Sequence, residues 1–140
     1  MSLTAKELDV ISRTIWGEAR GEPLLGKIAV AYVIYNRVTM DLHGDNKPDW
    51  WGEGVIGVCQ KPAQFSCWNE GDPNRAKLLD VTADDDAAKE CLYVALGVWL
   101  RFLADPTNGA THYHATSVSP AWARGRLDGQ QIGQHVFYRL

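Results

Sequence analysis

The chain has 140 residues, a length that suits one domain with a substantial hydrophobic core. Its formal net charge is −3 and it has no long basic run, so a role in nucleic-acid binding has no electrostatic support. No apolar run is long enough to cross a bilayer, and the first residues lack the apolar region of a signal peptide. We expect a single domain over residues 1–140 that is made in the cytoplasm and does not insert into a membrane.

Two long helices are predicted in the first 40 residues. Thr4 and Glu7 match a capping box at the start of the first helix, which is expected over residues 5–20 and ends at a glycine and a proline. The second helix is expected over residues 24–38. Because its centre is apolar on every side, it should be buried.

The middle of the chain is expected to be irregular. Polar and turn-forming residues dominate residues 39–57, and at least one of Trp50 and Trp51 should pin this segment to the body of the domain. Shorter elements should follow: a helical turn at 55–59, a loop or short strand at 61–68, and a short helix from about 72–74 to Val81.

The cleanest helical periodicity falls over residues 84–103, where a further helix is predicted. Its apolar residues recur at helical spacing and should form its core face: Ala88, Cys91, Leu92, Ala95, Trp99 and Phe102. The chain has three cysteines, an odd number that argues against a closed disulfide framework, although Cys59 and Cys67 could pair after export. We expect reduced thiols.

The last third of the chain predicts a small β element. After a turn at Asn108 and Gly109, alternation predicts a strand with His112 and His114 on one side and Tyr113 on the other. A closing strand is expected over residues 132–138. The fold class predicted is mainly α (α+β).

Glu18 is the anomaly of the first predicted helix. It shares a helix face with Leu8, Ile11 and Ile15, where a hydrophobic residue would be expected. A carboxylate that faces a core is costly unless it is paired, protonated or used in chemistry. The pattern leaves two interpretations open: a structural glutamate held by an arginine or by backbone amides, and a general acid that keeps its proton in an apolar pocket.

Other chemistries have weaker signals. His112, His114 and His135 could supply three metal ligands, but the motifs H-E-x-x-H and C-x-x-C are absent. The nucleophile motif G-x-S-x-G is absent too, and nothing local marks a cysteine as a nucleophile. A glycosidase would instead use Glu18 to protonate the leaving oxygen, with aromatic, amide and imidazole groups around the sugar rings.

Four ordered blocks make the sequence similar to a known family. They are residues 14–22 (TIWGEARGE) with 29–38 (AVAYVIYNRV), 61–68 (KPAQFSCW), 105–114 (DPTNGATHYH) and 132–138 (IGQHVFY), and they resemble the SleB/CwlJ cell-wall hydrolase family. The blocks cover nearly the whole chain at compatible spacing, which makes the match far more specific than any single motif.

The resemblance implies a lysozyme-like domain that acts on peptidoglycan glycan strands without a cofactor or metal. It implies lytic transglycosylation between N-acetylmuramic acid and N-acetylglucosamine, with a 1,6-anhydro product and Glu18 as the only catalytic carboxylate. The candidate substrate-binding residues are Gln64, Phe65, Ser66, Trp68, His112, Tyr113, His114, Trp122 and Glu22. Two rival functions stay open. One is a metal-dependent amidase or peptidase that uses the three histidines, and the other is a non-catalytic module that stacks Trp50, Trp51, Trp68 and Trp122 on glycans.

The sequence departs from the family in two places. Asn108 stands where the family often has a second glycine, and the stretch at residues 41–54 is longer than in spore-cortex members. The chain also lacks their signal sequence and separate peptidoglycan-binding domain, which favours a bacteriophage or prophage endolysin. Such a protein is expected to act on the cell wall as a monomer, released by a holin-type partner that permeabilises the membrane.

Overall fold

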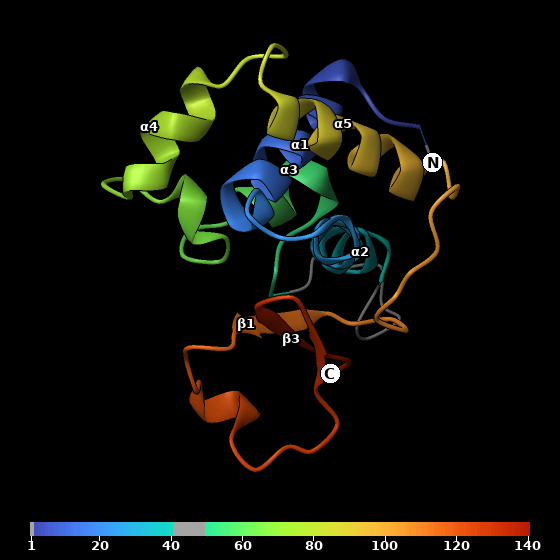
Figure 1. Cartoon of the computed structure of the whole chain (residues 1–140), viewed down its shortest axis with the longest axis vertical. Helices are drawn as coiled ribbons and strands as arrows, with labels where there is room; N and C mark the ends of the chain where they lie inside the picture. The colour runs from blue at the N-terminus through green and yellow to red at the C-terminus, as the bar shows by residue number, and fades with distance from the viewer. Residues whose placement is uncertain (1, 41–49) are drawn as a thin grey trace.

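The computed structural model describes residues 2–40 and 50–140 (Figure 1). The α-helices gather in the upper part of the view in Figure 1, and the sheet lies below α2 near the C-terminus. A mainly α fold with a small β element is thereby confirmed. Its elements are α1 (Ala5–Ala19), α2 (Leu24–Thr39), α3 (Gly54–Cys59), η1 (Ser66–Trp68), α4 (Pro73–Asp80), α5 (Asp86–Trp99), β1 (His112–Ala115), η2 (Ala121–Ala123), β2 (Gln130–Ile132) and β3 (His135–Tyr138).

Helices α1 and α2 form the centre of the core. The predicted capping box is present at the start of α1, where Thr4 and Glu7 exchange side chain–backbone hydrogen bonds of 3.0 and 3.1 Å. The apolar centre of α2 is buried on all sides, as its sequence predicts. Helix α5 packs against both, and an ion pair of 2.7 Å between Lys27 and Glu90 joins α2 to α5.

Helix α5 is shorter than predicted, and its core face is rotated. It ends at Trp99 because Arg101 adopts a left-handed backbone conformation, with φ of 64°. Phe102 therefore lies beyond the helix and is 82% exposed, and Leu92 is 38% exposed, so both were wrongly assigned to the core. The buried face consists of Cys91, Val94, Ala95, Val98 and Trp99.

The sheet has the strand order β1-β3-β2, with both pairs antiparallel. The single closing strand predicted at residues 132–138 is instead a hairpin, in which Ile132 ends β2 and His135 begins β3. The turn between them needs Gly133, whose φ is 59° and whose added Cβ would lie 2.6 Å from a Glu22 oxygen. The register places Tyr113 opposite Phe137.

The structure of the central loops agrees only in part with the predictions from the sequence. Trp51 is 1% exposed and pins its segment as expected, whereas Trp50 is 57% exposed. The predicted loop or strand at 61–68 is a turn followed by η1. Within the long stretch at residues 41–54, residues 41–49 lie outside the described part of the chain. Cys59, Cys67 and Cys91 are buried free thiols.

Among the described helices, none is both long and apolar enough to cross a membrane.

Candidate active site

Glu18 lies in the last turn of α1, where the helical layer meets the sheet. Its Oε1 accepts a hydrogen bond of 2.6 Å from the hydroxyl of Tyr113 on β1. Its Oε2 accepts a longer one, 3.4 Å, from the backbone N–H of Cys67 in η1. Two elements that are distant from α1 in the sequence therefore contact the two oxygens of the Glu18 carboxyl group.

Gly17 explains how η1 can approach so closely. A Cβ at this position would lie 2.7 Å from Cys67 Cβ and 2.8 Å from Cys67 Sγ, distances that real Cβ atoms do not adopt. Only glycine leaves room for η1 against α1 here. The pair Gly17–Glu18 in the sequence thus combines the space for η1 with the carboxyl group that η1 contacts.

Tyr113 reaches Glu18 from the sheet and is supported by its neighbours. Its ring packs edge-on against His135 with centroids 4.9 Å apart, and it lies 5.5 Å from the ring of Phe137 on the neighbouring strand. Desolvation, and then the nearby Glu18 carboxylate, raise the pKa of Tyr113 well above its usual value. The phenol therefore stays protonated and remains a hydrogen-bond donor to Glu18.

A cavity of about 310 Å³ opens beside this cluster. Tyr113 lines it and so connects it with Glu18, which is not itself among the described lining residues. Two exposed indoles, Trp50 and Trp122, are suited to stacking on sugar rings. The described lining residues are Arg37, Trp50, Lys61, Pro62, Ala63, Gln64, His112, Tyr113 and Trp122.

His112 lies between these two indoles, with ring centroids 5.6 Å from Trp50 and 5.3 Å from Trp122. Burial, followed by the positive charges of Arg37 and Arg126, lowers the pKa of His112 to about 4. At neutral pH the imidazole is therefore uncharged. One ring nitrogen lies 2.9 Å from Thr111 Oγ1.

The two other histidines of the predicted metal set have different surroundings. His114 stacks on Tyr138 and its Nε2 lies 3.0 Å from the Tyr138 hydroxyl, whereas His135 packs on Tyr113. Within residues 2–40 and 50–140, no group of three or more His, Cys, Asp or Glu side chains is arranged to hold a metal ion. The described structure thus does not bring the three histidines together as a ligand set.

Glu22 is placed away from the cavity. Its side chain is 9% exposed, and its Oε1 accepts a hydrogen bond of 2.8 Å from the backbone N–H of Gln134. The same oxygen lies 3.3 Å from Nδ1 of His135, whose pKa is lowered by burial, an effect that the Glu22 and Glu18 charges oppose. Glu22 therefore links the β2–β3 turn to the segment between α1 and α2, and it is not among the described residues that line the cavity.

The block at residues 61–68 divides between the cavity and the core. Gln64 lines the cavity, and its amide donates to the carbonyls of Trp51 and Val58 at 2.8 and 2.9 Å. Phe65 is 1% exposed and belongs to the core, so it is not available to bind substrate. The remaining two candidates, Ser66 and Trp68, lie in η1 outside the cavity lining, and the Trp68 indole donates to Thr14 at 2.9 Å.

Four of the described lining residues were not predicted to belong to the site: Arg37, Lys61, Pro62 and Ala63. In the sequence they stand only within the family blocks at residues 29–38 and 61–68. For Arg37, the available signal was a basic residue at the end of a buried helix. Nothing in the local pattern says that its side chain turns toward β1.

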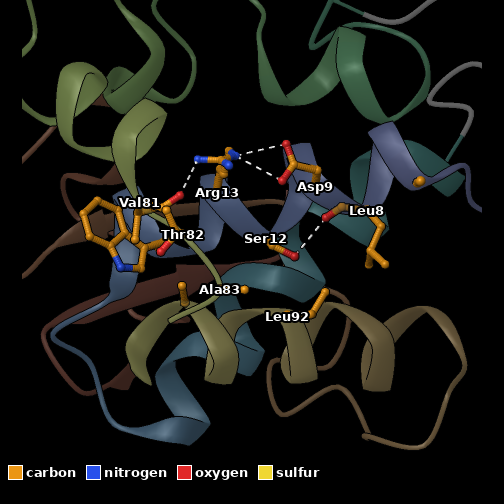
Figure 2. Close-up of a pocket in the computed structure, with 11 residues that line it drawn as sticks. Leu8, Asp9, Ser12, Arg13, Val81, Thr82, Ala83 and Leu92 are labelled. Atoms are coloured by element: carbon orange, nitrogen blue, oxygen red, sulfur yellow. Dashed lines mark hydrogen bonds and ion pairs between the residues drawn. The ribbon is translucent and has the colours of Figure 1, made fainter. Parts of the chain in front are cut away.

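A second cavity, of about 210 Å³, lies between α1 and the start of α5 (Figure 2). Its charged side chains, Asp9 and Arg13, face each other on α1 and pair at 3.0 Å. Arg13 also donates to the carbonyl of Val81 at 3.1 Å. None of the predicted catalytic or substrate-binding residues lines this cavity, so the candidate site is the one beside Tyr113.

Comparisons with known proteins identify the family of this chain. A family profile described as cell wall hydrolase matches residues 21–138, and the chain therefore belongs to the cell wall hydrolase family. Glu18 lies just before the matched segment. Similar proteins include the spore cortex-lytic enzymes of Bacillus subtilis (strain 168) and Halalkalibacterium halodurans, each 30% identical over 94% of this chain. The chain spans 37% and 34% of their respective lengths.

Solved structures with the same fold extend over almost the whole chain. The catalytic domain of the Bacillus cereus SleB protein is 28% identical, with a TM-score of 0.65 over 97% of this chain and 91% of that one. The catalytic domain of the germination-specific lytic transglycosylase SleB of Bacillus anthracis is also 28% identical, with a TM-score of 0.67 over 97% of this chain and 96% of that one. The named relatives are bacterial, and they give the endolysin prediction no support.

Proposed function

We propose that this chain degrades peptidoglycan by lytic transglycosylation at the bond between N-acetylmuramic acid and N-acetylglucosamine, with Glu18 as acid and then base. The observation that carries the proposal is the fixed Glu18 carboxyl group, held at 2.6 Å by Tyr113 next to a cavity flanked by indoles. Membership of the cell wall hydrolase family supports the substrate class, and the similarity to the lytic transglycosylase of Bacillus anthracis supports the reaction type.

The reaction needs one carboxyl group. Glu18 gives its proton to the glycosidic oxygen as the bond between this oxygen and the muramoyl C1 breaks. The muramoyl C6 oxygen then bonds to C1, and the hydroxyl proton passes to the Glu18 carboxylate. The result is a 1,6-anhydromuramoyl end and a free 4-hydroxyl on the leaving sugar, with Glu18 protonated again. Glu22, the neighbouring carboxylate, is hydrogen-bonded to the β2–β3 turn, and the proposed reaction does not use it.

The other groups have positioning roles in this proposal. The Tyr113 hydroxyl and the Cys67 N–H orient the carboxyl group, so the proton is delivered along a fixed direction. Neutral His112 offers a hydrogen-bonding edge between Trp50 and Trp122, while the two indoles hold sugar rings by stacking.

The direct test replaces Glu18 with Gln and compares it with Glu53→Gln, a change at an exposed glutamate. Glu18→Gln should fold and lose at least about a thousandfold in lysis of purified cell walls, because it removes the proton donor, while the control stays at wild-type rate. Mass spectrometry of the wild-type digest should find anhydromuropeptides. Reducing muramic acid ends would instead indicate hydrolysis, and binding without soluble products would indicate a glycan-binding module. New peptide or amide ends that disappear with a chelator and return with zinc would favour the metal-dependent rival.

A further inference from the structure

The cavity contains a buried cation that the proposed chemistry does not use. Arg37, near the end of α2, is 7% exposed and lines the cavity. Its Nε donates to the carbonyl of Thr111 at 2.7 Å, which anchors the start of β1. The guanidinium carbon lies 6.0 Å from the ring centroid of Trp50 and 5.7 Å from that of Trp51. Aromatic rings and a backbone carbonyl thus hold the group in one orientation.

The positive charge of Arg37 persists at neutral pH. Burial lowers the pKa of Arg37 to about 10, which still leaves the guanidinium protonated in neutral solution. Lys61 adds a second cation to the lining, His112 is neutral, and none of the described lining residues is acidic. The described wall of the cavity is therefore positively charged, although the whole chain is negative by three charges.

We propose that Arg37, assisted by Lys61, binds a carboxylate on the 3-O substituent of the muramoyl residue, and so selects the sugar on which the anhydro ring forms. This inference rests on the proposed function. N-acetylmuramic acid and N-acetylglucosamine differ only in this lactyl substituent, so stacking on Trp50 and Trp122 cannot separate them. A guanidinium can distinguish the two sugars, because its planar N–H donors match both oxygens of a carboxylate. Tyr113 lines the same cavity and contacts Glu18, so one side chain connects the carboxylate site with the acid.

The test measures the binding of three sugars to the whole chain by NMR or calorimetry. The probes are N-acetylmuramic acid, its uncharged lactyl amide and N-acetylglucosamine. The acid should bind at least tenfold more tightly than the amide, and the amide should match N-acetylglucosamine within about threefold. The advantage of the acid should shrink at high salt. Equal binding of the acid, the amide and muramoyl-L-alanyl-D-glutamate, whose carboxylates lie on the peptide, would overturn the proposal.

Variants then assign the preference to residues. Arg37→Gln should remove the preference for the acid but leave N-acetylglucosamine binding unchanged. Because this change also removes the bond to Thr111, Lys61→Gln is the second variant, and it should reduce the preference by about threefold. Lys89→Gln, at a 61% exposed lysine on α5, is the matched control and should keep the full preference. A preference retained in both Arg37→Gln and Lys61→Gln would contradict the assignment.

Two sources of the carboxylate can be separated with one more probe. In muramoyl-L-alanyl-D-glutamate the lactyl carboxyl is consumed in an amide, and the carboxylates lie on the peptide. If this compound binds as tightly as the free acid, the site reaches the stem peptide. If its affinity only equals that of the lactyl amide, while the free acid binds more tightly, the site binds the lactyl carboxylate. The reaction itself is checked separately. Anhydromuropeptides without a preference for either carboxylate would refute only this inference. A preference without such products would refute the proposed function and the selection of the anhydro sugar, and would leave only the carboxylate binding by Arg37.

Discussion

Replacing Gly17 with alanine tests whether the close approach of η1 to α1 holds Glu18 in place. Inside a helix this change ordinarily stabilises a protein by about 1 kcal/mol. Here the new Cβ would lie 2.7 Å from Cys67 Cβ, and relief to an ordinary contact of about 3.6 Å needs a shift of roughly 1 Å. Overpacking of this kind costs about 1–3 kcal/mol. Two Cys67 atoms lie less than 3 Å from the added Cβ, and Leu78 Cδ2 lies 3.2 Å from it. We therefore expect a cost at the upper end of this range.

The net expectation is a loss of about 1–2 kcal/mol in the free energy of unfolding, or roughly 3–6 °C in Tm for a domain of this size. Activity should fall further, by ten- to a hundredfold, because a shift of about 1 Å displaces the Cys67 N–H from Glu18. The assays are thermal unfolding and the initial rate of cell-wall lysis. Gly21→Ala is the matched control, since no atom lies within 4 Å of its added Cβ. If Gly17→Ala were as stable and as active as this control, the reasoning would be refuted.

Two further predictions concern the sheet side of the site. Tyr113→Phe removes the donor at 2.6 Å from Glu18 and should lower the lysis rate about ten- to a hundredfold with little loss of binding, whereas Tyr93→Phe, at a 57% exposed tyrosine, should change neither. Because burial lowers the pKa of His112 from 6.5 to about 4, the unfolded chain binds more protons in this range. Stability should therefore fall as the pH drops from about 6.5 to 4 in urea titrations, and His112→Gln should flatten this part of the curve. An unchanged slope in that variant would assign the acid sensitivity to other groups.

Local patterns predicted the elements that depend on near neighbours in the chain. The capping box fixed the start of α1, and the uninterrupted apolar centre of α2 showed that it is buried, because both features come from contacts within a few residues. Helix α5 exposes the limit of this approach. Its periodicity fits more than one face, and the packing of α5 against α1 and α2 decided that the face with Val94 and Val98 is buried.

The same limit applies to the residues of the site. Glu18 lies in the last turn of α1 and Glu22 lies just beyond the helix, and the sequence could not say which contacts each carboxylate makes. The β2–β3 turn, which comes more than one hundred residues later, occupies Glu22, while Tyr113 from β1 contacts Glu18. Phe65 and Trp68 were likewise predicted to bind substrate. In the structure Phe65 lies in the core, and the Trp68 indole donates a hydrogen bond to Thr14.

The sequence by itself determined the helices of the first third, the anomalous position of Glu18 and the family blocks, because these are carried by residue order and short spacing. Only the tertiary structure decided that Gly17 admits η1, that Tyr113 completes the Glu18 site and that Arg37 reaches the cavity. Those contacts join segments separated by about 50 to 95 residues, such as the Glu18 bonds to Cys67 and Tyr113. Their geometry follows from how the layers pack, and no local pattern encodes it.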